Sequence, residues 1–87
     1  MKINPDYRLD YDMDDIRIQR READEWCDLA PISETAAMVW EGVERGIDRA
    51  RLIEAVVNEF DGADEATVAA DMDALIAQLT ALGIIEI

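Results

Sequence analysis

The fold is decided between residues 29 and 40, which run Leu29-Ala30-Pro31-Ile32-Ser33-Glu34-Thr35-Ala36-Ala37-Met38-Val39-Trp40. A strand-like segment ends at Leu29, and Pro31 interrupts it because proline has no N–H to donate to a sheet. The Ser33 side chain can then cap a helix by accepting a hydrogen bond from a first-turn amide. We therefore expect a helix at about 34–45, with Trp40 in the middle of its buried apolar stripe.

The residues before this stretch indicate a small sheet. Strands are expected at about 7–12, 16–20 and 25–29. Apolar and charged residues alternate in the first of them, which is the pattern of a half-buried strand. In the third, alternation puts Cys27 and Leu29 on one face and Trp26 and Asp28 on the other. Cys27 is expected to face the core, and Trp26 to lie exposed.

The residues after it indicate two more helices, at about 49–60 and 65–82. The last of them has the clearest apolar period, with spacings of four and three residues: Val68, Met72, Leu75, Leu79 and Leu82. Gly83 stops this helix, and the tail at 84–87 forms either a closing strand or an apolar cover. Residues 1–87 are therefore expected to form one α+β domain, winged helix-turn-helix-like, with a small three-stranded antiparallel sheet followed by three α-helices.

The charge of the chain restricts its partners. The net charge is −13, from 21 acidic and 8 basic residues, and no Lys or Arg occurs between residues 52 and 87. A winged DNA reader would place the helix that begins near Asp64 in the major groove, but acids on that helix repel phosphates. We expect neither nucleic acid nor a membrane as partner. The acids serve solubility or steer a protein partner, and both explanations remain open.

The sequence offers no residues for catalysis, so we expect no enzyme activity. Histidine is absent, Cys27 has no partner for a redox or zinc pair, and no glycine-rich phosphate loop occurs. A buried structural thiol is the role expected for Cys27. A single cysteine and an N-terminus without a hydrophobic signal favour the cytoplasm.

Metal binding is not expected either, although acids are plentiful. Asp10, Asp12 and Asp14 have the spacing of a calcium loop. Asp15 stands where that loop needs glycine, and Arg21 where it needs a bidentate glutamate. We therefore expect no metal and no cofactor.

The order of the segments resembles the PqqD-like family of peptide chaperones, the precursor-peptide recognition elements of ribosomal peptide pathways that make natural products and cofactors. The junction from strand to first helix is similar at Leu29, Thr35, Ala36, Val39 and Trp40. The second helix resembles the family from residue 52 to Phe60, and the third at Val68, Asp71, Met72, Leu75, Leu79, Leu82, Gly83 and Ile84. The chain differs at Ala30-Pro31, where the family often has asparagine after the strand.

The resemblance implies a binding function without catalysis. Family members bind the leader segment of a precursor peptide as an added strand and present it to a radical-SAM enzyme, a cyclodehydratase or a lasso-peptide leader peptidase. The implied peptide-binding residues lie on the third strand and the third helix: Glu25, Trp26, Cys27, Asp28, Leu29, Val68, Asp71, Met72 and Leu75. Asp28 and Asp71 would pair with a basic residue of the leader.

Two alternatives remain open at this point. Val68, Met72 and Leu75 fit core packing as well as a groove wall, because helical stripes usually pack inward. The protein itself is either a leader-binding module or an acidic winged-helix adaptor that binds another protein without binding DNA. An exposed edge strand also favours self-association, so a homodimer through that edge is a further possibility.

Overall fold

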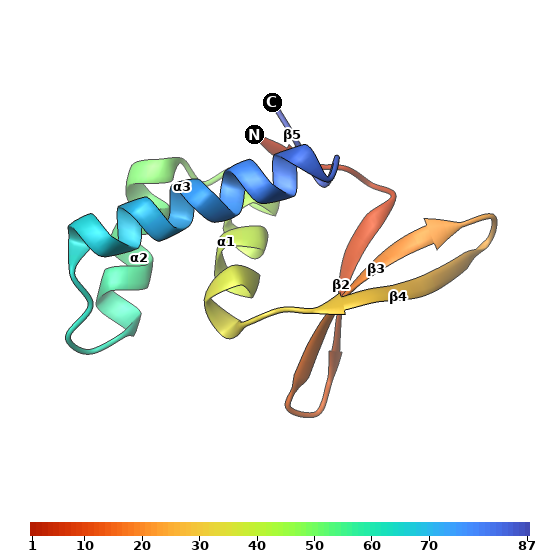
Figure 1. The fold of residues 1–87 in the computed structure, drawn as a ribbon, viewed down its shortest axis with the longest axis horizontal. Helices are drawn as coiled ribbons and strands as arrows, with labels where there is room; N and C mark the ends of the chain where they lie inside the picture. Colours follow the sequence, from red (N-terminus) through yellow and green to blue (C-terminus); the bar gives the residue numbers. More distant parts are fainter.

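The computed structural model describes residues 1–87 and shows a body of three helices from which a sheet extends as two hairpins (Figure 1). The elements in chain order are β1 (Lys2–Ile3), β2 (Tyr7–Asp12), β3 (Asp15–Glu22), β4 (Glu25–Pro31), α1 (Glu34–Glu44), α2 (Arg49–Glu59), α3 (Glu65–Ala81) and β5 (Ile85–Glu86). The three-stranded sheet has the order β2-β3-β4, and both pairs are antiparallel. The fold class expected from the sequence is confirmed.

Each helix begins at a side chain that caps it. Ser33 accepts a hydrogen bond from the amide of Ala36 at 3.1 Å, which is the contact expected from the sequence. Asp48 and Asp64 cap α2 and α3 in the same way, at 2.9 and 3.0 Å. These caps satisfy amides that have no partner inside the helix, so they fix where each helix starts.

The two ends of the chain are joined by a second, very short sheet. β1 pairs antiparallel with β5, with Ile3 opposite Ile85. The backbone of Asn4 donates to Ile84 at 2.8 Å, and its side-chain amide donates to the carbonyl of Gly83 at 3.0 Å. The C-terminal tail is thus a strand, and the N-terminus holds it against the helices instead of covering β4.

A β-bulge interrupts the pairing of β3 with β4. Ile18 lies opposite Ala30 and Gln19 opposite Asp28, so Leu29 is the extra residue with no partner. A bulge inserts one residue and breaks the alternation of side chains. The prediction that Leu29 shares the inward face of Cys27 is therefore wrong, and 47% of Leu29 is exposed.

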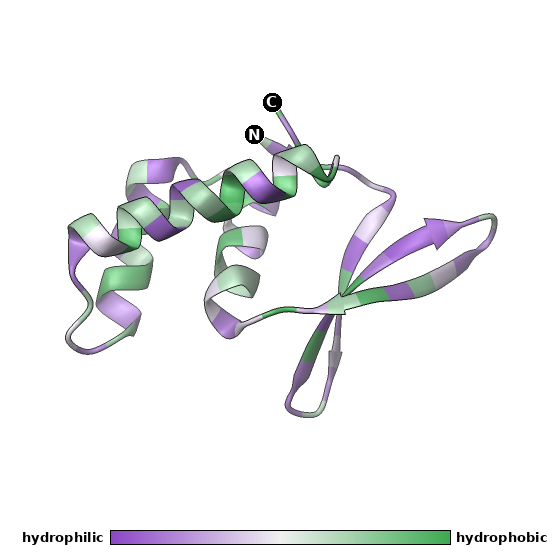
Figure 2. Ribbon diagram, in the orientation of Figure 1, coloured by the Kyte–Doolittle hydropathy of each residue, from purple (hydrophilic) through white to green (hydrophobic).

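The core lies among the helices, where Trp40 is fully buried as expected. One buried cluster joins residues of all three helices with Ile84, Ile85 and a single residue of the large sheet, Ile18. Hydrophilic residues recur along both projecting hairpins (Figure 2). None of the helices combines the length and the apolar character that a membrane crossing requires.

Candidate functional site

One long side of β4 has no neighbouring strand. β3 pairs with the other side of β4. The two remaining short strands, β1 and β5, pair with each other in a separate sheet and not with β4. The backbone N–H and C=O groups on a free edge can accept an added strand. The predicted edge, residues 25–29, is therefore available in this fold.

A cavity of about 430 Å³ opens where β4 runs into α1, and we call it the helical groove. Its walls come from α1, the end of α2, and α3. They consist of Ser33, Thr35, Ala36, Val39, Val56, Phe60, Ala63, Val68, Asp71, Met72 and Leu75. The structure thus brings together all four α3 residues that the sequence placed in a groove wall.

These α3 residues combine the two roles that the sequence left open. Met72 is only 3% exposed and belongs to the core cluster, yet it also lines the helical groove. Val68 and Leu75 are half-buried and pack against the same core. The floor of the groove is therefore the outer surface of the core, which gives it a fixed shape.

Sequence reasoning missed the walls of the groove that come from the other two helices. Phe60, expected as the last residue of the second helix, instead follows the last residue of α2 and is half-buried beside the cavity. Its position at the end of an apolar stripe, directly before Asp61-Gly62, is the signal that could have found it, since stripe ends are less covered than stripe centres.

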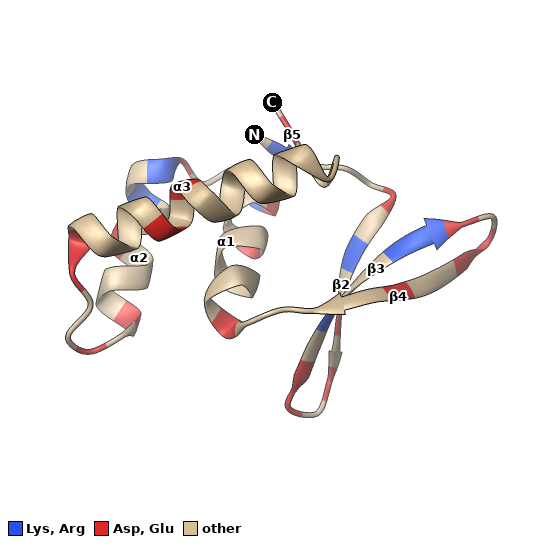
Figure 3. Cartoon of the chain, in the orientation of Figure 1, with Lys and Arg blue, Asp and Glu red and all other residues tan.

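Charge is distributed unevenly around the groove. Asp71 is the only charged residue among those that line it. α3 carries acids and no Lys or Arg, whereas four of the arginines lie on β2 and β3 (Figure 3). An apolar cavity with one carboxylate in its wall favours a ligand that carries apolar side chains and a basic one.

A row of polar contacts crosses the outer face of the sheet and ends on β4. Arg8 donates through Nε to Gln19 Oε1 at 2.7 Å, and Gln19 donates to Asp28 Oδ1 at 2.8 Å. The guanidinium carbon of Arg8 also lies 4.3 Å from the ring centre of Trp26. Trp26 is consequently half-buried, more covered than the sequence predicted, and the row holds both Trp26 and Asp28 on β4.

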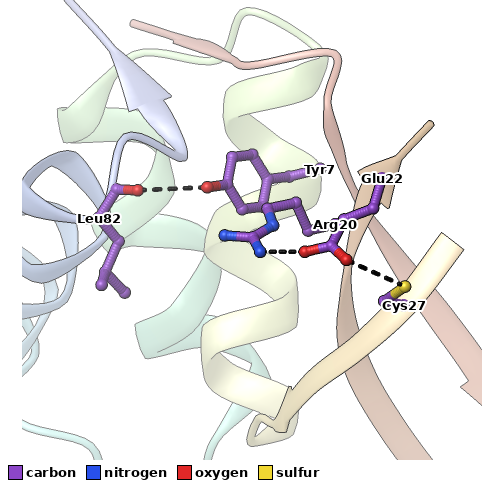
Figure 4. Close-up of polar contacts among 5 residues, drawn as sticks. All are labelled: Tyr7, Arg20, Glu22, Cys27 and Leu82. Carbon is purple, nitrogen blue, oxygen red and sulfur yellow. Dashed lines mark hydrogen bonds and ion pairs between the residues drawn. The ribbon is translucent and has the colours of Figure 1, made fainter.

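Cys27 lies on the other face of β4, opposite Arg20 (Figure 4). The expectation that Cys27 is a buried thiol facing the core is wrong: Cys27 is only half-buried and lies outside the core cluster. Its thiol donates to Glu22 Oε2 at 3.7 Å, and Glu22 also forms an ion pair with Arg20. Partial burial and then the Glu22 carboxylate raise the pKa of the Cys27 thiol. The thiol stays protonated at neutral pH and is a weak nucleophile.

The residues predicted for the site fall into two groups on different elements, and the short segment from residue 30 to Ser33 connects them. Residues 25–29 lie along the free edge of the projecting sheet, and the α3 residues line the helical groove (Figure 1). Ser33, two residues after β4 ends, belongs to the groove wall. An extended ligand on the edge of β4 would therefore reach the groove at the β4–α1 junction. No group of three or more His, Cys, Asp or Glu side chains is arranged to hold a metal ion.

Comparison with known proteins identifies the family. Residues 31–85 match the family model described as coenzyme PQQ synthesis protein D (PqqD), and since this is well over half of the chain, the chain belongs to that family. The resemblance drawn from the sequence is confirmed. The match begins at the last residue of β4 and ends at the first residue of β5, so it covers the three helices but not the rest of the large sheet.

A solved structure extends the likeness to the whole fold. This structure, "TbiB1 in Complex with the TbiA(beta) Leader Peptide", is similar with a TM-score of 0.77 over 99% of this chain and 95% of that one. Sequence identity is 19%, so the similarity establishes the shared fold. A comparison with curated proteins gave no match.

Proposed function

We propose that this protein binds the leader segment of a ribosomally made precursor peptide, without catalysing a reaction itself. The leader would add as a strand to the free edge of β4 and place apolar side chains in the helical groove. The observation that carries the proposal is that the unpaired edge strand β4 ends at Pro31, two residues before Ser33 in the wall of the helical groove. Membership of the PqqD family supports it, and so does the likeness to TbiB1, whose structure is a complex with a leader peptide.

Strand addition suits this edge for a physical reason. The backbone groups of residues 25–29 supply hydrogen bonds that do not depend on the peptide sequence, and the groove selects side chains. The exposure of Leu29 also supports this proposal. The sequence predicted an inward Leu29, whereas the bulge leaves its apolar side chain exposed on the edge strand. Asp28 and Asp71 would pair with basic residues of the leader.

The bound leader would be presented to a separate maturation enzyme. Family resemblance suggests a radical-SAM enzyme, a cyclodehydratase or a leader peptidase. On this proposal the protein works in the cytoplasm, where precursor peptides are made and where Cys27 stays reduced.

The test is a calorimetric titration with the leader peptide encoded by a short reading frame beside this gene. Val68→Asp places a charge in the apolar groove and should weaken binding at least about tenfold. Ala70→Asp is the matched control, because Ala70 is exposed on α3 and does not line the groove. It should bind like the unchanged protein.

Absence of binding in a folded sample would reject the proposal and favour the acidic adaptor. Equal weakening by Val68→Asp and Ala70→Asp would reject the groove as the site.

A further inference from the structure

The two hairpins of the sheet have the same turn geometry but different residues in it. Met13 and Ala23 each occupy the first central position of a two-residue turn, with φ of 55° and 54°. Glycine is the residue that such a position favours. Ala23 is small, whereas Met13 presents a long apolar side chain that is 98% exposed. Met13 therefore contributes nothing to the core and adds backbone strain.

Met13 borders a second cavity, which we call the hairpin cleft. It has a volume of about 380 Å³ and lies between the β2–β3 hairpin and α1. Tyr11 and Ile16 line it from the hairpin and Met38 from α1, and 54% of Tyr11 is exposed. Exposed apolar side chains gathered around a hollow are characteristic of a surface that another molecule covers.

The charges around the hairpin cleft all have one sign. Asp14, Glu34 and Glu41 line it, and no Lys or Arg does. The hydroxyl of Tyr11 donates to Glu41, and burial followed by this contact raises the pKa of Tyr11 to about 12, so the hydroxyl stays protonated. The cleft is thus complementary to an apolar side chain between basic residues. A second copy of this chain, with net charge −13, would be repelled.

α1 separates the hairpin cleft from the helical groove. Thr35, Ala36 and Val39 line the groove, whereas Glu34, Ala37, Met38 and Glu41 line the cleft. At about 100° per residue these two sets lie on opposite faces of the helix. A peptide bound in the groove therefore leaves the cleft open to another molecule.

We propose that the hairpin cleft docks the maturation enzyme while the leader peptide occupies the helical groove. The docking segment of the enzyme carries an exposed apolar side chain flanked by Lys or Arg. This inference rests on the proposed leader-binding function, since that function requires an enzyme as second partner. The two partners would approach α1 from opposite sides.

The test uses the full chain, the leader peptide, and the peptide-modifying enzyme encoded beside this gene. Met13→Gly removes the apolar side chain and relieves the positive φ, so the protein should fold at least as well. Asp14→Lys reverses one charge in the cleft. Ala23→Gly and Asp24→Lys make the same changes at the equivalent turn of the other hairpin and serve as matched controls. Affinity for the leader and affinity for the enzyme are measured separately for each variant.

Met13→Gly should weaken enzyme binding about fivefold and Asp14→Lys about tenfold, with leader affinity unchanged and both controls unchanged. The proposal would be overturned if Met13→Gly and Asp14→Lys both bind the enzyme as tightly as the unchanged protein. It would also be overturned if the control variants lose as much affinity for the enzyme as the cleft variants do. Loss of leader affinity in the cleft variants would place the leader there instead and would also overturn it. Enzyme binding is measured in the absence of the leader peptide. If the unchanged protein does not bind the leader, that result therefore rejects the proposed leader-binding function and not the docking site.

Discussion

The helical body and the three-stranded sheet differ in how they are stabilised. Ile18 is the only buried residue of β2, β3 and β4, whereas α1, α2 and α3 together with Ile84 and β5 contain the rest of the core. The sheet depends instead on the hydrogen bonds between its strands and on the row of polar contacts that runs from Arg8 through Gln19 to Asp28. The helices thus supply most of the buried core, and the sheet leaves one edge of β4 unpaired.

The largest expected effect separates the two tryptophans. Trp40→Ala should reduce the free energy of unfolding by about 3–5 kcal/mol, because a fully buried indole leaves a large cavity. Trp26→Ala on the outer face of the sheet should cost only about 1 kcal/mol, the size of a lost cation–π contact. Urea unfolding followed by circular dichroism measures both. Equal losses would contradict the division between body and sheet.

The next effect concerns the single buried residue of the sheet. Ile18→Ala should cost about 2–4 kcal/mol, since it removes a core side chain. Amide hydrogen exchange should accelerate mainly in β2, β3 and β4, because Ile18 is the one buried side chain of the sheet in the core, and Tyr7 and Leu9 pack against that core only in part. If α1 and α3 lose protection to the same degree, then the helical body and the sheet unfold as one unit. That result would contradict the difference in stabilisation between them.

A smaller loss of stability is expected from breaking the row of polar contacts on the outer face of the sheet. Arg8→Ala removes the guanidinium above Trp26 and the donor to Gln19, so β4 loses a support worth about 0.5–1 kcal/mol. Tryptophan fluorescence should shift to longer wavelength, and leader affinity should fall about two- to fivefold. Arg17→Ala, on the same face of the sheet but outside the row, is the control. Unchanged fluorescence in Arg8→Ala would show that the row does not hold Trp26.

The smallest effect lies within the helical body and depends on pH. Arg49 of α2 forms two contacts with Asp73 of α3, at 2.6 and 2.8 Å, and this hydrogen bonding lowers the pKa of Asp73. A carboxyl whose pKa is lower in the folded state stabilises the fold above its unfolded value of about 3.9, and the contribution is lost as pH falls through the folded value. The contribution is lost between about pH 5 and 2. Over this range, the melting temperature of Arg49→Gln should change less with pH than that of the unchanged protein. An identical profile would show that the pair contributes nothing.

Local chemistry explains which parts of the fold were predictable. Ser33, Asp48 and Asp64 carry cap signals in the sequence itself, so helix starts could be placed from it. The wall residues Val68 and Leu75 followed from the period of one helix together with a family resemblance. These features depend on neighbours within a few residues.

The features that escaped prediction depend on contacts between distant residues. The bulge at Leu29 is set by pairing across β3 and β4, and no residue within β4 signals it. β1 has only two residues, and it forms a strand only through its pairing with β5, near the other end of the chain. Trp26 is covered by Arg8, which comes from a strand that is not its neighbour. Alternation alone therefore assigned Leu29 to the wrong face and overestimated the exposure of Trp26.

The central claim is that a leader peptide adds to β4 as a strand. Amide hydrogen exchange by NMR, with and without the leader peptide encoded beside this gene, tests it directly, because new backbone hydrogen bonds slow exchange at the amides that make them. We expect amides within residues 25–29 to gain protection of at least about tenfold, together with chemical-shift changes from Val68 to Leu75. Binding that leaves exchange in β4 unchanged, or that shifts only residues around Met13, would contradict the account.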